Sequence, residues 1–190
     1  MTREKISLGI MLVLVIAVSI LIMVVPTLFT KNISRISSNK EINLPLILND
    51  EKEIKLLFFG YSGCTKICTP RLQAINDLYS SLDEKTKKRV GVEFLDISVP
   101  NKTTLPAEFA SSFNKEFKGI YLSQEILRDY TKEFKVFFSP SLINKIEFDH
   151  TTNLYLVKKS RNKKEIRYIY NSYPYDFKQI KSDIKELLNE

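Results

Sequence analysis

The stretch that most constrains the fold is an apolar strand signal that runs directly into a pair of cysteines. Residues 56–59, Leu-Leu-Phe-Phe, are typical of a buried strand and lead into a glycine-containing turn. Cys64 and Cys68 follow at C-x-x-x-C spacing and are the only two cysteines of the chain. Thr69 is then expected to be the N-cap of a helix, with Pro70 as a tolerated first helical residue. Both thiols are therefore expected on a strand-to-helix turn.

That position favours the thiolate form of a cysteine, because the positive end of a helix dipole lowers the pKa of a nearby thiol. A thiolate binds soft metal ions or attacks disulfides, so the pair is a candidate for either chemistry. The structural alternatives are a local disulfide and two inert core thiols. The spacing is wider than the redox C-x-x-C motif, and it is not a zinc pattern without a second pair.

The order of elements after the cysteines predicts an α/β domain. Apolar residues at three-and-four spacing over 71–82 indicate a core-facing helix, and the β-branched run 90–99 indicates a second strand. A strand–helix–strand crossover implies a parallel pair. The remaining expected elements are helices over 106–117, 124–134 and 175–188, a short strand over 119–122, and a hairpin of strands 154–157 and 166–170. This order predicts a thioredoxin-like α/β sandwich with a central mixed sheet.

The N-terminal segment predicts a membrane anchor. No charged residue occurs from Ile6 to Phe29, and a helix of that length spans the hydrocarbon core of a bilayer. Arg3 and Lys5 precede the run, which favours a cytoplasmic position for residues 1–5. A cleaved signal peptide is the rival interpretation, but the apolar run exceeds a normal signal core and no clear A-x-A-like site follows it.

The predicted layout is a single transmembrane helix over 6–29, a polar tether over 30–45 and a folded domain over 46–190. A short strand is expected around 44–48, where the domain begins. The domain is expected on the non-cytoplasmic side of the membrane, in a bacterial periplasm or cell exterior or in the mitochondrial intermembrane space.

Composition separates this chain from disordered and nucleic-acid-binding proteins. Its 190 residues are 44% hydrophobic and 27% charged, as in an ordinary globular protein. The formal charge is +7 at pH 7, but the lysines are spread along the chain without a glycine-rich loop or an aromatic RNA-binding signature. The charge is therefore assigned to a solvated surface or to steering toward an acidic partner, and no nucleic-acid partner is expected.

The single histidine of the chain is the third candidate ligand. His150 lies in the loop that enters the first strand of the terminal hairpin. In a thioredoxin-like sheet this loop faces the cysteine-bearing turn, so two thiolates and one imidazole could converge. Sulfur-rich surroundings select Cu(I), and imidazole also admits Cu(II). A lone histidine is more often surface or core filler, so the metal-site prediction depends on the fold.

Residues 60–68, Gly-Tyr-Ser-Gly-Cys-Thr-Lys-Ile-Cys, together with Asp149-His150 and the Leu-Tyr-Leu-Val strand that follows, resemble the Sco/SenC family. The resemblance extends from about residue 46 to the C-terminus. It implies a membrane-anchored, thioredoxin-like copper protein that acts in assembly of the CuA centre of cytochrome c oxidase. It also implies that Cys64, Cys68 and His150 are copper ligands and that the two cysteines cycle between dithiol and disulfide.

The chain departs from the family pattern at several positions. Thr65 and Thr69 stand where members usually have proline, and the loop over 98–104 lacks their usual aspartates. The leading hypothesis is a metallochaperone that passes copper to the copper-bearing subunit of cytochrome c oxidase or to another cysteine-containing acceptor. The alternative is a thiol–disulfide oxidoreductase whose catalytic redox pair is Cys64 and Cys68. A peroxidase-like enzyme and an anchored structural domain with a disulfide are further alternatives.

Overall fold

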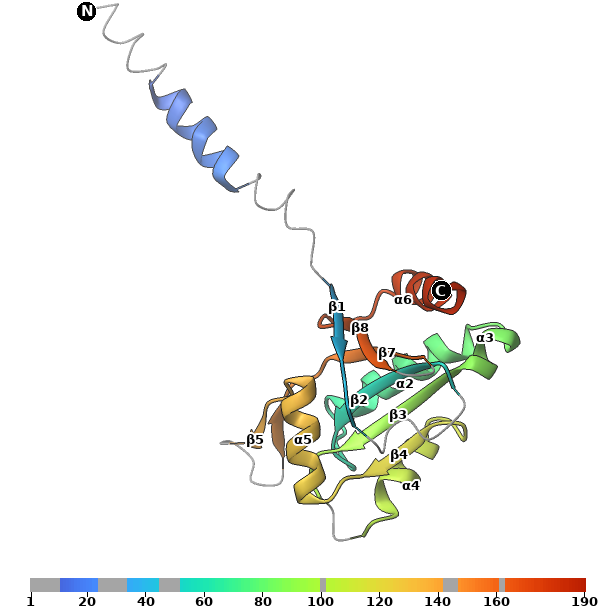
Figure 1. Cartoon of the computed structure of the whole chain (residues 1–190). Helices are drawn as coiled ribbons and strands as arrows, with labels where there is room; N and C mark the ends of the chain where they lie inside the picture. Colours follow the sequence, from blue (N-terminus) through green and yellow to red (C-terminus); the bar gives the residue numbers. More distant parts are fainter. Residues whose placement is uncertain (1–10, 24–33, 45–51, 100–101, 142–146, 161–162) are drawn as a thin grey trace, which may run out of the picture. The chain divides into compact units, whose positions relative to one another are not determined.

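A computed structural model of the chain describes residues 11–23, 34–44, 52–99, 102–141, 147–160 and 163–190. The chain divides into two units, residues 1–33 and 34–190. In the first unit, residues 11–23 are helical (Figure 1). Among the described residues, no helix combines the length and apolar character needed to cross a membrane. The other residues of the predicted anchor over 6–29 lie outside the described ranges.

The second unit is built on a six-stranded sheet with strand order β1-β8-β7-β2-β3-β4. The strand β2 pairs parallel with β3 and antiparallel with β7, so the predicted mixed sheet is confirmed. The crossover from β2 to β3 and the terminal hairpin of β7 and β8 are also confirmed. The bounds are β1 Arg35–Glu41, β2 Ile54–Gly60, β3 Val90–Asp96, β4 Lys118–Tyr121, β7 Leu154–Lys159 and β8 Lys164–Tyr170.

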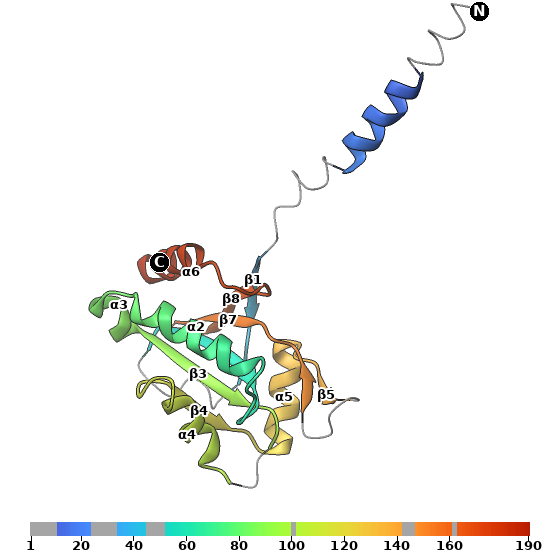
Figure 2. The same cartoon turned by 180° about the vertical axis from the view of Figure 1, so that it is seen from behind.

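Helices cover both faces of this sheet, which makes the predicted thioredoxin-like sandwich (Figures 1 and 2). The helices are α2 Cys68–Ser80, α3 Glu84–Arg89, α4 Leu105–Ser111, α5 Gln124–Phe134 and α6 Phe177–Asn189. The side chains of β2 point alternately into two hydrophobic cores, one on each face of the sheet. Leu56 and Phe58 pack in the cluster that contains residues of α2, α4 and α6, whereas Leu57 and Phe59 pack in the cluster that contains residues of α5.

The structure differs from the sequence prediction at the start of the domain. Residues 30–45 were expected to form a tether, but Arg35–Glu41 is strand β1, which pairs antiparallel with β8 at the edge of the sheet. The Arg35 guanidinium pairs with the buried Asp183 carboxylate on α6 and also lies 4.5 Å from the Tyr168 ring centroid. Strand β1 was not predicted because its Ser, Asn and Lys residues give little apolar signal. A strand at the edge of a sheet can form with only one face buried. The strand expected around 44–48 lies mostly outside the described residues.

Two further local predictions were wrong. The helix α2 begins at Cys68, and its N-cap is Ile67, which makes no side-chain cap bond. Thr69 is therefore inside the helix, where its hydroxyl donates to the Cys64 carbonyl at 2.9 Å. The helix expected over 106–117 ends at Ser111. A short hairpin of β5 Phe138–Pro140 and β6 Phe148–His150 was not predicted.

We expect Gly119→Ala to destabilise the domain by about 3 kcal/mol, at the upper end of the range for overpacking. A Cβ at this position of β4 would lie 1.8 Å from the Pro106 carbonyl oxygen and 2.6 Å from the Ala107 nitrogen. Both atoms are backbone, so no side-chain rotation relieves the clash. Urea unfolding of the full chain measures the effect, with Lys118→Ala as the control at the exposed neighbouring position. A loss below 1 kcal/mol for Gly119→Ala would contradict this close approach of α4 to β4.

Candidate metal centre

The two cysteines lie beyond the carboxyl end of β2, Cys64 in the loop that leads into α2 and Cys68 as the first residue of that helix. The Cys64 N–H donates to the Tyr61 carbonyl at 3.2 Å, which closes a turn directly after the strand. The Cys68 N–H donates to the Cys64 sulfur at 3.2 Å, and the Thr69 N–H donates to the Cys64 carbonyl at 3.1 Å. The first amides of α2 are therefore satisfied by Cys64, and its sulfur lies at the positive end of the helix.

A buried carboxylate fixes this loop to the neighbouring strand. Asp96, the last residue of β3, is fully buried, and its Oδ2 accepts hydrogen bonds from the Ser62 N–H at 2.9 Å and from the Ser62 hydroxyl. Its Oδ1 accepts from the N–H and the hydroxyl of Ser98. The carboxylate thus ties the cysteine loop to the loop that follows β3. Sequence analysis missed Asp96, although an acidic residue at the end of an apolar strand is a signal that could have identified it.

The histidine reaches the cysteines from the other side of β2. His150 is the last residue of β6 and pairs with Phe138 of β5. Its Nδ1 lies 2.9 Å from the Thr151 carbonyl oxygen, which can only accept, so Nδ1 carries the proton. Nε2 is therefore the ring nitrogen that could bind a metal, and this atom lies 3.7 Å from the Cys68 sulfur. This tautomer is the one that a metal ligand requires.

Tyr61 packs against the histidine and was not predicted as a site residue. Its ring meets the His150 ring edge to face at 6.0 Å and the Phe148 ring at 5.4 Å. Burial, followed by hydrogen bonding to Cys64, raises the pKa of the Tyr61 hydroxyl above its ordinary value. The phenol therefore stays protonated and lies beside the Cys64 sulfur. Its position three residues before the first cysteine was the available sequence signal.

The two thiols differ in acidity because they share hydrogen bonds unequally. The pKa of Cys64 lies well below its ordinary value, chiefly because the Cys68 thiol donates to it, with the N–H groups of Cys68 and Ile67 adding to the effect. The pKa of Cys68 is raised by the same contact and by burial. The reduced pair is therefore a Cys64 thiolate beside a Cys68 thiol.

The three predicted residues come together in a group that fits a single metal ion. One ligand atom from each of Cys64, Cys68 and His150 lies within 4.8 Å of the other two. Three donors spread at about 120° around one ion, with metal–sulfur bonds of about 2.3 Å and metal–nitrogen bonds of about 2.0 Å as for zinc, lie about 3.7–4.0 Å apart. The group would therefore contract by at most about 1 Å on binding the ion. Two sulfurs and one imidazole are donors that suit a soft ion such as Cu(I).

The three candidate ligands are accessible from the Cys64 side, where Cys64 borders a pocket. A pocket of about 180 Å³ lies beside Cys64. The Lys66 ammonium at its rim pairs with the Glu147 carboxylate at 3.2 Å. Cys64 lines this pocket, whereas Cys68 is fully buried. A small molecule or a partner's side chain would therefore reach Cys64 first.

Comparisons with known protein sequences give a family match and several relatives. The SCO1/SenC family model matches residues 51–189. A SCO2-like protein of Rickettsia conorii is 24% identical over 138 residues, which are 65% of this chain and 63% of that protein. The mitochondrial protein SCO2 of Saccharomyces cerevisiae is 26% identical over 92 residues, which are 48% of this chain and 31% of that protein. The matched regions therefore span less than two thirds of these relatives.

Solved structures share the fold. Apo Sco1 from Thermus thermophilus superposes with a TM-score of 0.62 at 22% identity and covers 83% of this chain and 95% of its own. Copper-bound ScoI from Arabidopsis thaliana gives 0.59 at 18% identity, with 73% and 86% covered. Copper-bound yeast Sco1 gives 0.58 at 20% identity, with 73% and 77% covered. At these identities the likeness establishes the thioredoxin-like fold.

We expect iodoacetamide to alkylate Cys64 faster than Cys68 in the reduced full chain at pH 6. Cys64 is thiolate there because its pKa is lowered, whereas the raised pKa of Cys68 keeps it protonated. Trypsin cleaves at Lys66, between the two cysteines, so mass spectrometry reads each residue on its own peptide. Equal rates, or a Cys64 rate that rises about tenfold per unit from pH 6 to 8 as for an ordinary thiol, would contradict this assignment.

Proposed function

The chain belongs to the SCO1/SenC family, and from this premise we propose that it binds copper through Cys64, Cys68 and His150 and passes it to an acceptor protein. The observation that carries the proposal is the 3.7 Å approach of His150 Nε2 to the Cys68 sulfur, across 82 positions of sequence. The Thermus, Arabidopsis and yeast relatives share the fold, and the last two were solved with copper bound.

Copper is the cargo in this proposal, and the chain supplies the donors. Both cysteines must be reduced before the ion binds, so their redox state controls loading. The Cys64 thiolate is already available, and the Cys68 proton is released when the ion binds. Delivery proceeds by ligand exchange, in which donors of the acceptor replace those of the chain one at a time. Cys64 is the donor nearest the pocket, so the exchange begins there.

The acceptor that we propose is the copper-bearing subunit of cytochrome c oxidase, during assembly of its CuA centre. The family resemblance supports this acceptor. The same ligand exchange would deliver copper to another cysteine-containing acceptor with similar donors. Two apolar side chains near the site, Ile67 in the cysteine loop and Phe137 beside the loop of His150, are 39% and 66% exposed and offer apolar contact to a docking protein.

A second candidate function is thiol–disulfide exchange, which the low pKa of Cys64 favours. The Cys64 thiolate would attack one sulfur of a partner disulfide and expel the other as a thiolate, which takes up a proton. Cys68 would then lose its proton, attack the mixed disulfide and release the second partner thiol. The net reaction oxidises this pair to a disulfide and reduces the partner disulfide to two thiols.

We expect His150→Ala to weaken Cu(I) binding by at least about tenfold, because removing even an outer-shell partner of a metal site typically costs that much. The reduced full chain is titrated against a chromophoric Cu(I) chelator, and the wild type is expected to bind one ion. Thr152→Ala, in the same connection to β7, is the matched control and is expected to bind like the wild type.

The same variants separate the two candidate functions. If copper delivery is correct, His150→Ala loses copper but still reduces a test disulfide through Cys64 and Cys68. A wild-type chain that leaves Cu(I) with the chelator yet reduces the test disulfide would reject the copper proposal and retain the oxidoreductase. Equal copper binding by His150→Ala and the wild type would show that His150 is not a copper ligand.

A single transmembrane anchor over residues 6–29, with the domain on the non-cytoplasmic side, completes the proposal. It is supported by the uncharged apolar run from Ile6 to Phe29 and by the helix over 11–23. In intact cells, after mild reduction, a membrane-impermeant maleimide is expected to label Cys64. Labelling that appears only after the cells are broken would contradict the proposed orientation.

A further inference from the structure

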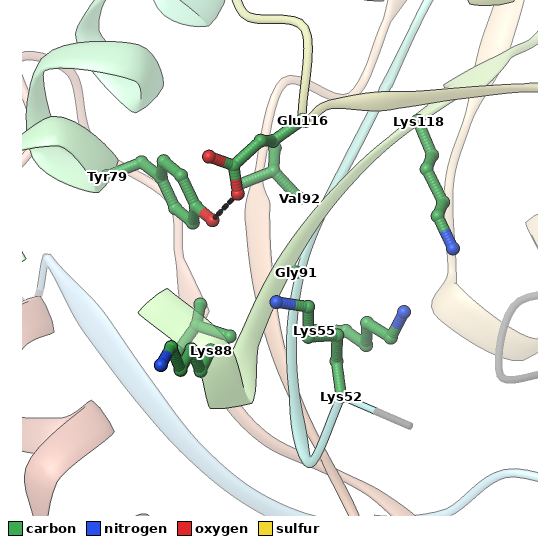
Figure 3. A pocket seen from close by; sticks show the side chains of 9 residues that line it. Lys52, Lys55, Tyr79, Lys88, Gly91, Val92, Glu116 and Lys118 are labelled. Carbon is green, nitrogen blue, oxygen red and sulfur yellow. Dashed lines mark hydrogen bonds between the residues drawn. The ribbon is translucent and has the colours of Figure 1, made fainter. Parts of the chain in front are cut away.

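A pocket lined by lysines lies at the opposite end of β2 from the cysteines. Its volume is about 460 Å³, which is within the range of ligand sites. Lys52 and Lys55 line it at the start of β2, Lys88 at the end of α3, and Lys118 at the start of β4. Figure 3 shows Lys88 and Lys118 on opposite sides of the pocket, with Lys52 and Lys55 between them. The strand β2 rises about 20 Å from this end to the cysteine loop.

The charge around the pocket is predominantly positive. Among the residues that line it, one carboxylate, that of Glu116, accompanies the four lysines. The Tyr79 hydroxyl donates to this carboxylate at 2.7 Å, which orients it toward the α2 side (Figure 3). With the buried Glu93, the partner of Lys55, included, four lysines accompany two carboxylates. A concave surface of one dominant sign concentrates counter-ions.

One of the four lysines is held inside the protein at a cost. Lys55 is fully buried, and its Nζ lies 2.6 Å from Oε1 of Glu93 on the adjacent strand. Gly91 makes room for it, because a Cβ there would lie 3.3 Å from the Lys55 Nζ. A buried ion pair costs several kcal/mol of desolvation per ion and is often less stable than an apolar replacement. Because Glu93 neutralises Lys55 inside the protein, a ligand in the pocket would meet Lys52, Lys88 and Lys118 directly.

We infer that this pocket binds a small soluble anion that carries two or more phosphate groups. In the described part of the chain, every cation that lines the pocket is a lysine. An ammonium group is a point charge that suits phosphate, whereas flat carboxylates favour the fork of arginine. The spread of Lys88 and Lys118 across the pocket suits a ligand with charge at both ends. The inference is independent of the proposed copper function.

Calorimetric titration of the copper-free, reduced full chain with inorganic pyrophosphate tests the inference. We expect saturable binding of one pyrophosphate per chain. Lys88→Gln combined with Lys118→Gln is expected to weaken it by at least about tenfold, since two of the attracting charges are removed. Both side chains are exposed, so this variant is expected to fold, which urea unfolding checks.

Lys178→Gln combined with Lys185→Gln is the matched control, because it removes the same charge from exposed positions of α6. We expect this variant to bind pyrophosphate within about twofold of the wild type, as its changes lie outside the pocket. Equal weakening by both double variants would overturn the site, as would the absence of saturable binding. Equal affinity for sulfate at the same ionic strength would overturn the requirement for two phosphate groups. Each of these failures would leave the copper proposal standing, because the measurement contains no copper.

Discussion

The pairing of β2 with strands on both sides is the constraint on which the candidate site depends. Every residue of β2 is buried, and the strand is held parallel to β3 and antiparallel to β7. The cysteine loop leaves the end of β2, and Leu154, the first residue of β7, pairs with Phe58 near that end. His150 comes just before β7 and is therefore delivered beside the loop. A register slip of one residue would exchange the side chains of β2 between the two cores. Burial of both faces therefore fixes the register, and with it the approach of His150 to the cysteine loop.

Close packing then sets the position of the sulfur atoms. A Cβ on Gly60 would lie 2.8 Å from the Cys68 sulfur and 3.0 Å from the Phe94 ring, so only glycine allows the sulfur to rest on the end of the strand. Asp96 holds the loop from the β3 side through Ser62, and Tyr61 packs on the His150 ring. The Cys68 thiol and the His150 imidazole are therefore held together by backbone that cannot move without disturbing the core. Such support before binding is what a site for a single ion requires.

The sequence predicted the parts of the fold in which hydrophobic periodicity is strong. The strand β2, the crossover to β3, the helix α5 and the terminal hairpin all follow clear apolar patterns. The edge strand β1 and the short β5–β6 hairpin were missed, because polar edge strands show little alternation and three-residue strands show none. His150 was placed through the fold prediction, whereas Asp96 and Tyr61 were missed because their roles depend on contacts between separate loops.

In the reduced site the Cys64 thiolate lies beside the Cys68 thiol and the His150 imidazole. The Cys68 thiol donates to the Cys64 thiolate, which raises the pKa of one group and lowers the pKa of the other. The imidazole lone pair of His150 faces the same region, and its other nitrogen is committed to the Thr151 carbonyl. A soft cation that replaces the Cys68 proton would meet two thiolates and Nε2 of the imidazole without a change of tautomer. Oxidation removes the same proton and both sulfur donors together, so a disulfide and a bound ion exclude one another at this end of β2.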